Sequence, residues 1–283
     1  MATIIKSILK FYYYMNDEVS DPRTKDWFLM SNPWPGVAIL GFYLYFVSNL
    51  GPRLMANRQP FKLDRILQIY NVIQIIFNIY LIYKALTLAW LNEYSYYCQP
   101  VDYSYSPHAI EIARTVWVYF IVKLIDLLDT VFFVLRKKNN QISFLHVYHH
   151  TGMVIGAWGG VKYLPGGHGT FLGLVNSFVH VIMYSHYFAT SLKISQPWWK
   201  KYITQLQLVQ FTIILFHFTQ LLWVDCGFPV WPAAIFIPQN LFMIILFGDF
   251  YYKTYVKKQI PKLNGVKNGV KKGIPNGSNS KLQ

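Results

Sequence analysis

The stretch Ile66–Trp90 has the sequence ILQIYNVIQIIFNIYLIYKALTLAW. A predominantly apolar run of this length can cross a bilayer as a helix, which takes about 20 residues. The run also lacks the strict alternation of a membrane strand. Six more segments of near-spanning length accompany it, so the sequence predicts an all-α integral membrane protein with seven transmembrane helices. These six are Val37–Asn49, Ala113–Leu135, Phe144–Val161, Gly169–Ser191, Thr204–Val224 and Phe228–Tyr252.

The composition agrees with a membrane protein. Of 283 residues, 54% are hydrophobic and 13% are charged, whereas about a quarter of the residues of a soluble domain are charged. The formal net charge of +14 would suggest a nucleic-acid partner in a soluble protein. Here the basic residues mostly follow hydrophobic segments, so we expect membrane lipid and no nucleic acid as a partner. The first residues contain no cleavage site typical of a signal peptide.

The basic residues alternate between loops and so predict an orientation. Loops one, three and five and the C-terminal tail are rich in Lys and Arg, and the loops between them are poor. Because basic loops stay in the cytosol, we expect a lumenal N-terminus and a cytosolic C-terminus. The predicted divisions are a lumenal segment 1–32, a seven-helix domain 33–255 and a disordered basic tail 256–283.

The two cysteines fall on the same predicted side of the membrane. Cys98 lies in the second loop and Cys226 in the sixth, both lumenal by this topology. Disulfides persist in that compartment, so we expect the two residues to be bonded. The alternative is a pair of free thiols.

A histidine cluster lies in the fourth segment, where residues 145–152 read LHVYHHTG. His146, His149 and His150 are spaced i, i+3 and i+4 and therefore share one side of a helix. Ionisable groups at membrane depth are costly and usually mark a working site. Eight positions separate His146 from Lys138, which places the cluster roughly 10 Å inside the cytosolic edge at 1.5 Å per residue.

Four other segments carry polar stripes. Lipid cannot satisfy these groups, so each stripe must face neighbouring helices or a cavity. A single stripe is often only a polar contact between helices, but four stripes and a histidine cluster predict an enclosed chamber. The stripes comprise Gln68, Asn71, Gln74 and Asn78; Lys123, Asp126, Asp129 and Thr130; Asn176, His180, Tyr184 and Tyr187; and Gln207, Gln210 and His217.

Histidine can serve here as metal ligand, general base or nucleophile. One cluster supplies few ligands for a di-iron site, so we expect no metal. With both cysteines lumenal, imidazole is the best nucleophile for a covalent acyl intermediate. Asn176, four residues before His180, is expected to hold that ring in one tautomer. Lys123 and Asp126 are spaced to form an ion pair, which is either part of the site or purely structural.

Several motifs resemble one family. Residues 146–150, HVYHH, resemble the histidine box of the very-long-chain fatty acid elongases, the 3-oxoacyl-CoA synthases of the endoplasmic reticulum. Three other stretches resemble further family motifs in order and spacing, and the resemblance extends from about Asp21 to Lys253. Departures are Asp126, where the family usually has Glu, and His186, where it often has Tyr. The three stretches that resemble further family motifs are 123–138, KLIDLLDTVFFVLRKK; 176–184, NSFVHVIMY; and 204–210, TQLQLVQ.

The resemblance implies a fold, a reaction and a location. Helices two to seven would form a six-helix barrel around a substrate tunnel closed at the lumenal end, with the first helix outside. Long-chain acyl-CoA would condense with malonyl-CoA to give a 3-oxoacyl-CoA two carbons longer, CO₂ and CoA, with no cofactor. The protein would lie in the endoplasmic reticulum membrane. The sequence leaves open a homo-oligomer, association with other enzymes of the elongation cycle, and the preferred acyl chain.

Residue roles combine this resemblance with the residue chemistry. His149 would attack the acyl thioester, while His146, His150 and His180 would transfer protons or stabilise oxyanions. Basic residues at the cytosolic mouth would bind CoA phosphates or serve orientation alone. The rival functions are an iron-dependent desaturase or hydroxylase and a seven-helix receptor or carrier. The predicted substrate-binding residues are Lys123, Asp126, Asp129, Asn176, Tyr184, Gln207 and Gln210, with Arg136, Lys137, Lys138, Lys200 and Lys253 at the mouth.

Overall fold

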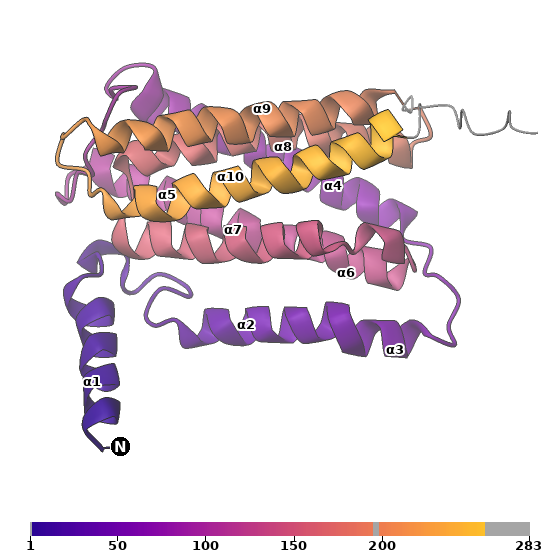
Figure 1. Ribbon diagram of the computed structural model, residues 1–283, viewed down its shortest axis with the longest axis horizontal. Helices are drawn as coiled ribbons and strands as arrows, with labels where there is room; N and C mark the ends of the chain where they lie inside the picture. The colour runs from indigo at the N-terminus through magenta and orange to yellow at the C-terminus, as the bar shows by residue number, and fades with distance from the viewer. Residues whose placement is uncertain (1, 195–197, 258–283) are drawn as a thin grey trace, which may run out of the picture.

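The computed structural model describes residues 2–194 and 198–257, and throughout this part of the chain the regular structure is helical (Figure 1). The predicted tail beyond residue 257 lies outside the described residues. Short 3₁₀ or π turns extend or connect several helices. The helices are α1 (Ala2–Tyr13), α2 (Trp34–Tyr45), α3 (Gly51–Met55), α4 (Asp64–Ala85), α5 (Pro107–Asp126), α6 (Leu128–Leu135), α7 (Phe144–Tyr163), α8 (Thr170–Ser191), α9 (Trp199–Thr219) and α10 (Trp231–Tyr251).

Four stretches of the described chain are long and apolar enough to span a membrane. They are Trp34–Met55, Asp64–Trp90, Trp199–Leu222 and Trp231–Val256. The other three predicted spans form α5 with α6, α7 and α8, which have the length but carry more charged or polar residues. These helices carry the ionisable residues of the polar stripes and the histidine cluster, which explains the difference.

Serine caps fix the start of two helices that carry predicted site residues. The Ser106 side chain accepts a hydrogen bond from the Ala109 amide and caps α5, and Ser143 does the same for His146 at the start of α7. Such caps satisfy amide groups that a first helical turn leaves unpaired. The Ser143 cap places the histidine cluster in the first two turns of α7. One predicted segment is broken, because α5 ends at Asp126 and α6 begins at Leu128.

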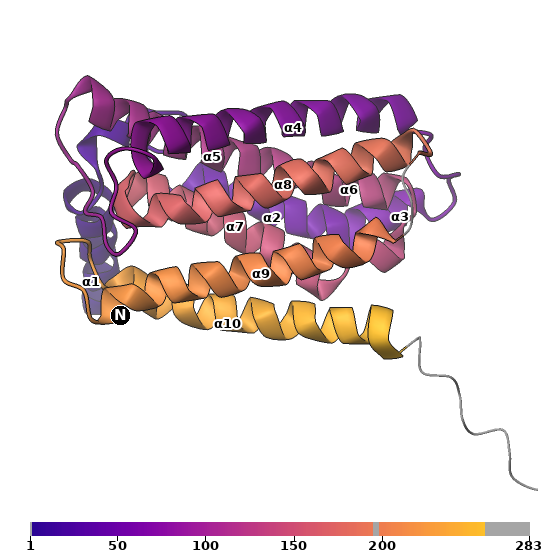
Figure 2. The same cartoon turned by 90° about the horizontal axis from the view of Figure 1, so that it is seen from above.

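The long helices run side by side (Figures 1 and 2). Helix α4 packs between α5 and α8, α9 packs between α8 and α10, and α7 packs on α5. Contact between α7 and α10 is much sparser than between these other neighbours. Helix α2 lies apart from α4 and α8–α10, on the α7 side, and α1 stands across the bundle axis (Figure 1). Helix α1 was not predicted, and its Ile4 and Ile8 side chains are more than half exposed.

A disulfide closes one end of the bundle. Cys98, in the loop after α4, is bonded to Cys226, in the turn between α9 and α10, which confirms the predicted pairing. Gly167 lies beside this loop with φ of +61°, and a Cβ atom there would come within 2.8 Å of the Gln99 carbonyl oxygen. The neighbouring His168 amide donates to the same oxygen at 2.8 Å. Glycine is therefore required for this close approach.

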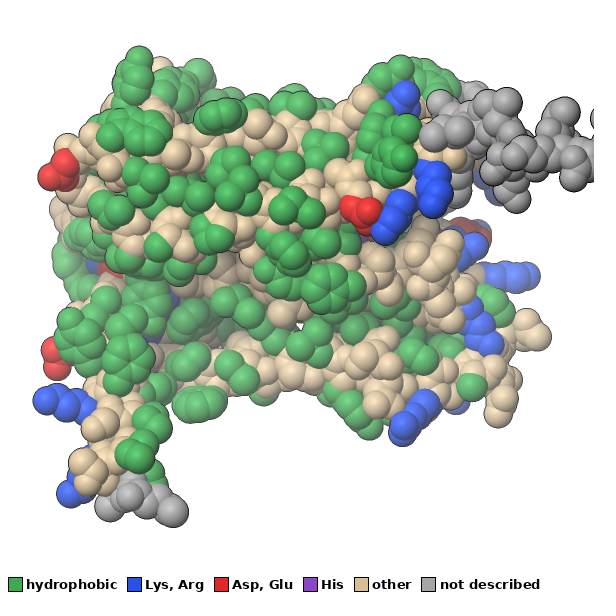
Figure 3. All heavy atoms as spheres, in the orientation of Figure 1, with side chains coloured by type: hydrophobic (Ala, Val, Ile, Leu, Met, Phe, Trp, Pro, Cys, Tyr) green, Lys and Arg blue, Asp and Glu red, His purple; other side chains and the backbone are tan. Residues whose placement is uncertain are grey.

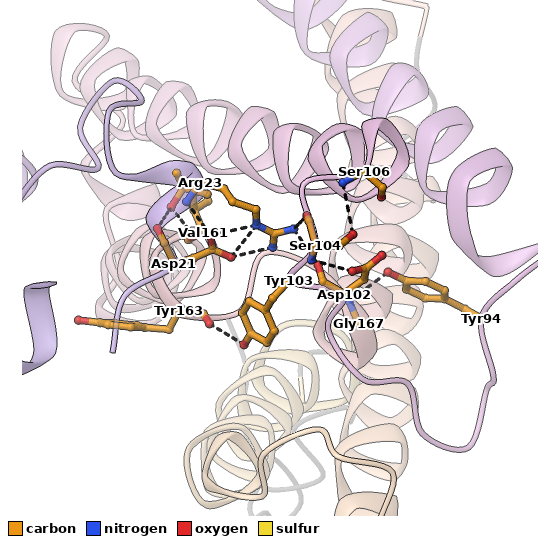
Figure 4. Close-up of polar contacts among 11 residues, drawn as sticks. Asp21, Arg23, Tyr94, Asp102, Tyr103, Ser104, Ser106, Val161, Tyr163 and Gly167 are labelled. Atoms are coloured by element: carbon orange, nitrogen blue, oxygen red, sulfur yellow. Dashed lines mark hydrogen bonds and ion pairs between the residues drawn. The ribbon is translucent and has the colours of Figure 1, made fainter. Parts of the chain in front are cut away.

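The N-terminal segment is clasped to the same end (Figure 4). Arg23 pairs with Asp21 at 2.7 Å, and its Nη1 donates to the carbonyl oxygens of Asp102 and Ser104, both at 2.8 Å. Hydrogen bonds from Ser104 lower the pKa of the Asp102 carboxyl group. The fully buried Lys162 donates to the Met30 carbonyl at 2.9 Å. Residues 21–30 thus pack as part of the bundle.

We expect removal of the disulfide to lower stability. The bond closes a loop with a sequence separation of 128, and the chain-entropy relation gives an upper bound of about 5 kcal/mol for its contribution. The double variant Cys98→Ser/Cys226→Ser should therefore unfold at lower temperature in detergent. The matched control is reduction of the native bond, which should produce the same shift. An unchanged unfolding temperature would show that the bundle holds this end without the bond.

Candidate functional site

The three histidines of α7 form one cluster in which the rings differ in surroundings. The centroids of the His146 and His150 rings lie 4.2 Å apart, and that of His149 lies 5.6 Å from His150. The His149 ring packs edge-on near Phe211 of α9 and Phe247 of α10. The cluster is therefore turned into the bundle, and not toward lipid.

His149 also lines the main cavity of the described structure. This cavity has a volume of about 850 Å³ and a largely apolar lining, within the range typical of ligand sites. It follows α7 from Phe144 to Leu164, toward the disulfide end. Polar side chains interrupt its wall at several points. They include Tyr119, Asn176, Gln210 and Asn240, and also Lys84, Thr115 and Thr170.

Three cavity-lining residues have a buried polar atom with no hydrogen-bond partner among the described residues. The atoms are Nε2 of His149, Oγ1 of Thr151 and Oε1 of Gln210. An unsatisfied buried polar atom is costly, by about 1–3 kcal/mol, and in a native protein it requires an explanation. A ligand group in the cavity would supply the missing partners.

A buried ion pair lies on the facing helices. Lys123 Nζ is 2.7 Å from Asp126 Oδ2 and donates to Asn176 Oδ1 at 2.9 Å. The Nδ1 atom of His180 is 3.4 Å from Lys123 Nζ and 3.6 Å from Asp126 Oδ2. The ion pair predicted from sequence is thus present and joined to His180. All four side chains are at least nine-tenths buried.

One predicted contact is wrong. Asn176 was expected to hold the His180 ring, but within the described structure its amide oxygen accepts from Tyr119 and Lys123, both at 2.9 Å. The spacing i, i+4 places two residues on one helix side but does not fix where each side chain ends. The neighbour of the His180 ring is instead the Lys123–Asp126 pair.

Tyr184 connects the two carboxylates of this region. Its hydroxyl lies 3.1 Å from Asp126 Oδ1 and 2.7 Å from Asp129 Oδ2. Gln74 of α4 donates to Asp126 at 2.7 Å and to Tyr70 at 3.0 Å. Asp129, one of the predicted substrate-binding residues, is thereby joined to Asp126 through the Tyr184 hydroxyl.

The sequence did not predict the hydrogen-bond partners of the His146 ring. Its Nε2 lies 3.0 Å from Thr130 Oγ1, which lies 2.8 Å from the hydroxyl of Tyr43 on α2. Thr130 belonged to a predicted polar stripe, so its spacing was a usable signal. Tyr43 gave none, because a tyrosine in an apolar helix is indistinguishable from a packing residue.

The other predicted site residues are more dispersed. Gln207 is half-buried, and its Nε2 lies 3.9 Å from the Met183 sulfur. Lys137 donates to the Ala56 carbonyl, and the exposed Lys253 pairs with Asp249 at 2.8 Å. Basic side chains gather at the end of the bundle opposite the disulfide (Figure 3). Arg136, Lys138 and Lys200 are half-buried or exposed there.

The histidines outside the cluster have structural partners. His168 and His217 stack with ring centroids 3.7 Å apart, and each ring bonds the backbone carbonyl of the other. His108 Nε2 lies 2.8 Å from the Leu88 carbonyl oxygen. In residues 2–194 and 198–257, no three His, Cys, Asp or Glu side chains are grouped so as to hold a metal ion.

Known proteins resemble this chain over most of its length. The model of the GNS1/SUR4 (ELO) family matches residues 28–262. The chain is 45% identical to a protein named very long chain fatty acid elongase 7 of Drosophila melanogaster, over 86% of the chain and 75% of that protein. It is 41% identical to very long chain fatty acid elongase 4 of Homo sapiens, over 94% of the chain and 87% of that protein.

Proposed function

Because the chain belongs to the GNS1/SUR4 (ELO) family of fatty acid elongases, we propose that it catalyses the condensing step of elongation. In this reaction a long-chain acyl-CoA and malonyl-CoA give a 3-oxoacyl-CoA two carbons longer, CO₂ and free CoA. The observation that carries the proposal is His149, a cavity-lining histidine whose buried Nε2 has no hydrogen-bond partner in the described part of the chain. No cofactor is needed, because decarboxylation of malonyl-CoA generates the carbon nucleophile.

The covalent step is assigned to His149. Its imidazole attacks the acyl thioester carbonyl, the bond between carbon and sulfur breaks, and CoA leaves as a thiolate that takes up a proton. Malonyl-CoA then loses CO₂, and its enolate attacks the cationic acyl-imidazolium, which keeps its Nδ1 proton, to release neutral His149. An apolar wall would protect this reactive intermediate from water.

Neighbouring groups would support the developing charges. The oxyanion at each carbonyl needs donors already in place, and the amide of Gln210 is a cavity-lining candidate. His180 would move a proton, with Lys123 and Asp126 setting its charge. His146 and His150 would act beside His149, with Thr130 fixing the ring of His146. Asp129 and Tyr184 would hold the Lys123–Asp126 pair in position.

The cavity suits an alkyl chain. It extends along α7 from His149 to Leu164, a rise of about 22 Å at 1.5 Å per residue. An extended chain advances about 1.2 Å per backbone bond. An acyl chain lying along α7 would therefore fit with roughly 18 carbons.

The topology completes the proposal. The contacts between neighbouring helices follow the order α4–α5–α7–α10–α9–α8–α4 and so form a ring. This ring supports a barrel built from six of the seven spans, with the span that contains α2 outside it. The tunnel would close at the disulfide end in the lumen of the endoplasmic reticulum. The basic end would face the cytosol, where Arg136, Lys137, Lys138, Lys200 and Lys253 would meet CoA phosphates. Self-association and contacts with other elongation enzymes are compatible with this arrangement.

A covalent intermediate can be detected directly. Purified enzyme incubated with long-chain acyl-CoA without malonyl-CoA should carry an acyl group on His149 in peptide mass spectrometry. Addition of malonyl-CoA should discharge it as the 3-oxoacyl product. Full elongation activity with an unmodified His149 would contradict the acyl-imidazole route and favour direct attack of the enolate on the thioester.

The disulfide end of the cavity should limit the length of the longest acyl product. Gly160 lines the cavity one helical turn before Leu164, and a leucine there would shorten the usable length by about 6 Å. At about 1.2 Å per bond, Gly160→Leu should move the longest product down by about four to five carbons. Gas chromatography of the products measures this shift. Gly41→Leu on α2, outside the cavity, is the matched control and should leave the product profile unchanged.

A further inference from the structure

The apolar cavity continues to a side of the bundle that would face lipid. Leu44 of α2, Phe144 and Ile155 of α7, and Ile235 of α10 line it, yet each of them is more than a third exposed. In Figure 3 a hollow lies between the side chains of α10 and those of α2. The wall between α7 and α10 is thus open where the other neighbouring helices are packed together.

The α7 side of this opening has little side-chain bulk. Gly152 and Gly159 line the cavity, and a Cβ atom added at either would meet nothing within 4 Å. At Gly156 the nearest atom to such a Cβ is Phe236 Cε1, at 4.0 Å. The space beside these glycines is therefore open and wide enough for added atoms.

Helix α10 is weakened opposite these glycines. Pro238 lies inside the helix and cannot donate to the carbonyl one turn earlier. The Asn240 side chain donates to the Phe236 carbonyl at 2.7 Å. Helices bend most readily where the backbone ladder is interrupted in this way. The parts of α10 before and after Pro238 can therefore move relative to each other.

One hydrogen bond fastens the two helices beside the catalytic histidine. The Tyr148 hydroxyl of α7 donates to Gln239 Oε1 of α10 at 2.6 Å. Tyr148 directly precedes His149, and both Tyr148 and Gln239 line the cavity. Among the described residues, no other side-chain hydrogen bond is recorded between α7 and α10. Opening this clasp would join the catalytic cavity to the bilayer.

From this geometry we propose that the α7–α10 opening is a lateral gate for the alkyl chain, and that the Tyr148–Gln239 hydrogen bond is its clasp. The acyl chain of the substrate would slide in from the membrane, and that of the product would slide out, while CoA stays at the basic end. This inference rests on the proposed condensing function. Sideways passage avoids drawing a long alkyl chain past the charged mouth and through water, which is unfavourable for apolar surface.

Cross-linking tests the gate. Because both native cysteines form the disulfide, the variant Tyr148→Cys/Gln239→Cys would carry the only free thiols. A short photocleavable bis-maleimide joins them, and light reverses the link without reducing the disulfide. The matched control is Gln205→Cys/Tyr251→Cys, which replaces a second Tyr–Gln hydrogen bond, of 2.8 Å, between α9 and α10.

The readout is elongation of a long-chain acyl-CoA supplied in vesicles, before linking, after linking and after light. The gate predicts that linking lowers multiple-turnover elongation by about tenfold or more, that light restores it, and that the control link has little effect. Unchanged elongation in the linked Tyr148–Gln239 variant, or an equal loss in the control, would overturn the gate. Inactivity of both variants before linking, with inactive native protein, would instead count against the condensing function.

Discussion

Replacement of His149 by alanine should lower CO₂ release from labelled malonyl-CoA by at least about 10³-fold, the scale on which loss of a covalent nucleophile acts. The physical reason is the unpartnered Nε2 on the cavity wall. Both cysteines are bonded at the far end, and the Lys84 amine on that wall is paired with Glu111 at 2.8 Å. Release of radioactive CO₂ from purified protein in the presence of acyl-CoA measures the effect.

The matched control is His108→Ala. His108 lies at the disulfide end, where its ring contacts the Leu88 carbonyl, and its loss should leave the rate within a few-fold of the native value. Both variants must retain the native unfolding temperature for the comparison to count. A His149→Ala protein that folds normally and keeps most of its CO₂ release would remove the nucleophile assignment.

The second large effect concerns the buried ion pair. Lys123→Met would leave the Asp126 carboxylate buried without its cation, and breaking such a pair typically costs about 3–5 kcal/mol. For a chain of this size that corresponds to a fall in Tm of roughly 10 °C. We expect elongation to fall as well, because His180 loses the Lys123 ammonium at 3.4 Å and keeps only the Asp126 carboxylate at 3.6 Å. Thermal unfolding in detergent measures the first effect.

A double variant separates pairing from simple loss of bulk. In Lys123→Met/Asp126→Leu neither charge remains, although Gln74 and Tyr184 lose an acceptor. Its unfolding temperature should therefore recover part of the loss seen in Lys123→Met, while elongation stays low. A double variant less stable than the native protein by the full sum of the Lys123→Met and Asp126→Leu single effects would show that the two side chains act independently.

The sequence alone predicts the features that depend on spacing. The histidine cluster, the Lys123–Asp126 pair and the Cys98–Cys226 bond all follow from periodicity and loop order, and the structure contains the pair and the bond. The break at Leu127 carries no Gly or Pro signal, so the run Ala113–Leu135 looked continuous. Helix α1 was not predicted, although Ile4, Ile5, Ile8 and Leu9 recur there at helical spacing.

Contacts between helices could not be predicted. The partner of Asn176 depends on how α5 and α8 are rotated against each other, and tertiary packing brought Tyr119 and Lys123 to its amide oxygen. Tyr43 reaches Thr130 only because α2 packs near α6. Helices α5, α7 and α8 carry polar residues that face the interior of the bundle. An average composition along each helix does not distinguish these residues from polar residues that would face lipid.

The contacts of Arg23 with the loop before α5 also decide where the chain can be shortened. Residues before Ser20 make few ties to the bundle, so fusions and deletions there should leave the fold intact. A deletion that reaches Met30 is different, because it removes Arg23 from two carbonyl oxygens and takes away the carbonyl that Lys162 donates to. The smallest part of this protein that folds on its own should therefore begin before α2, near Asp21.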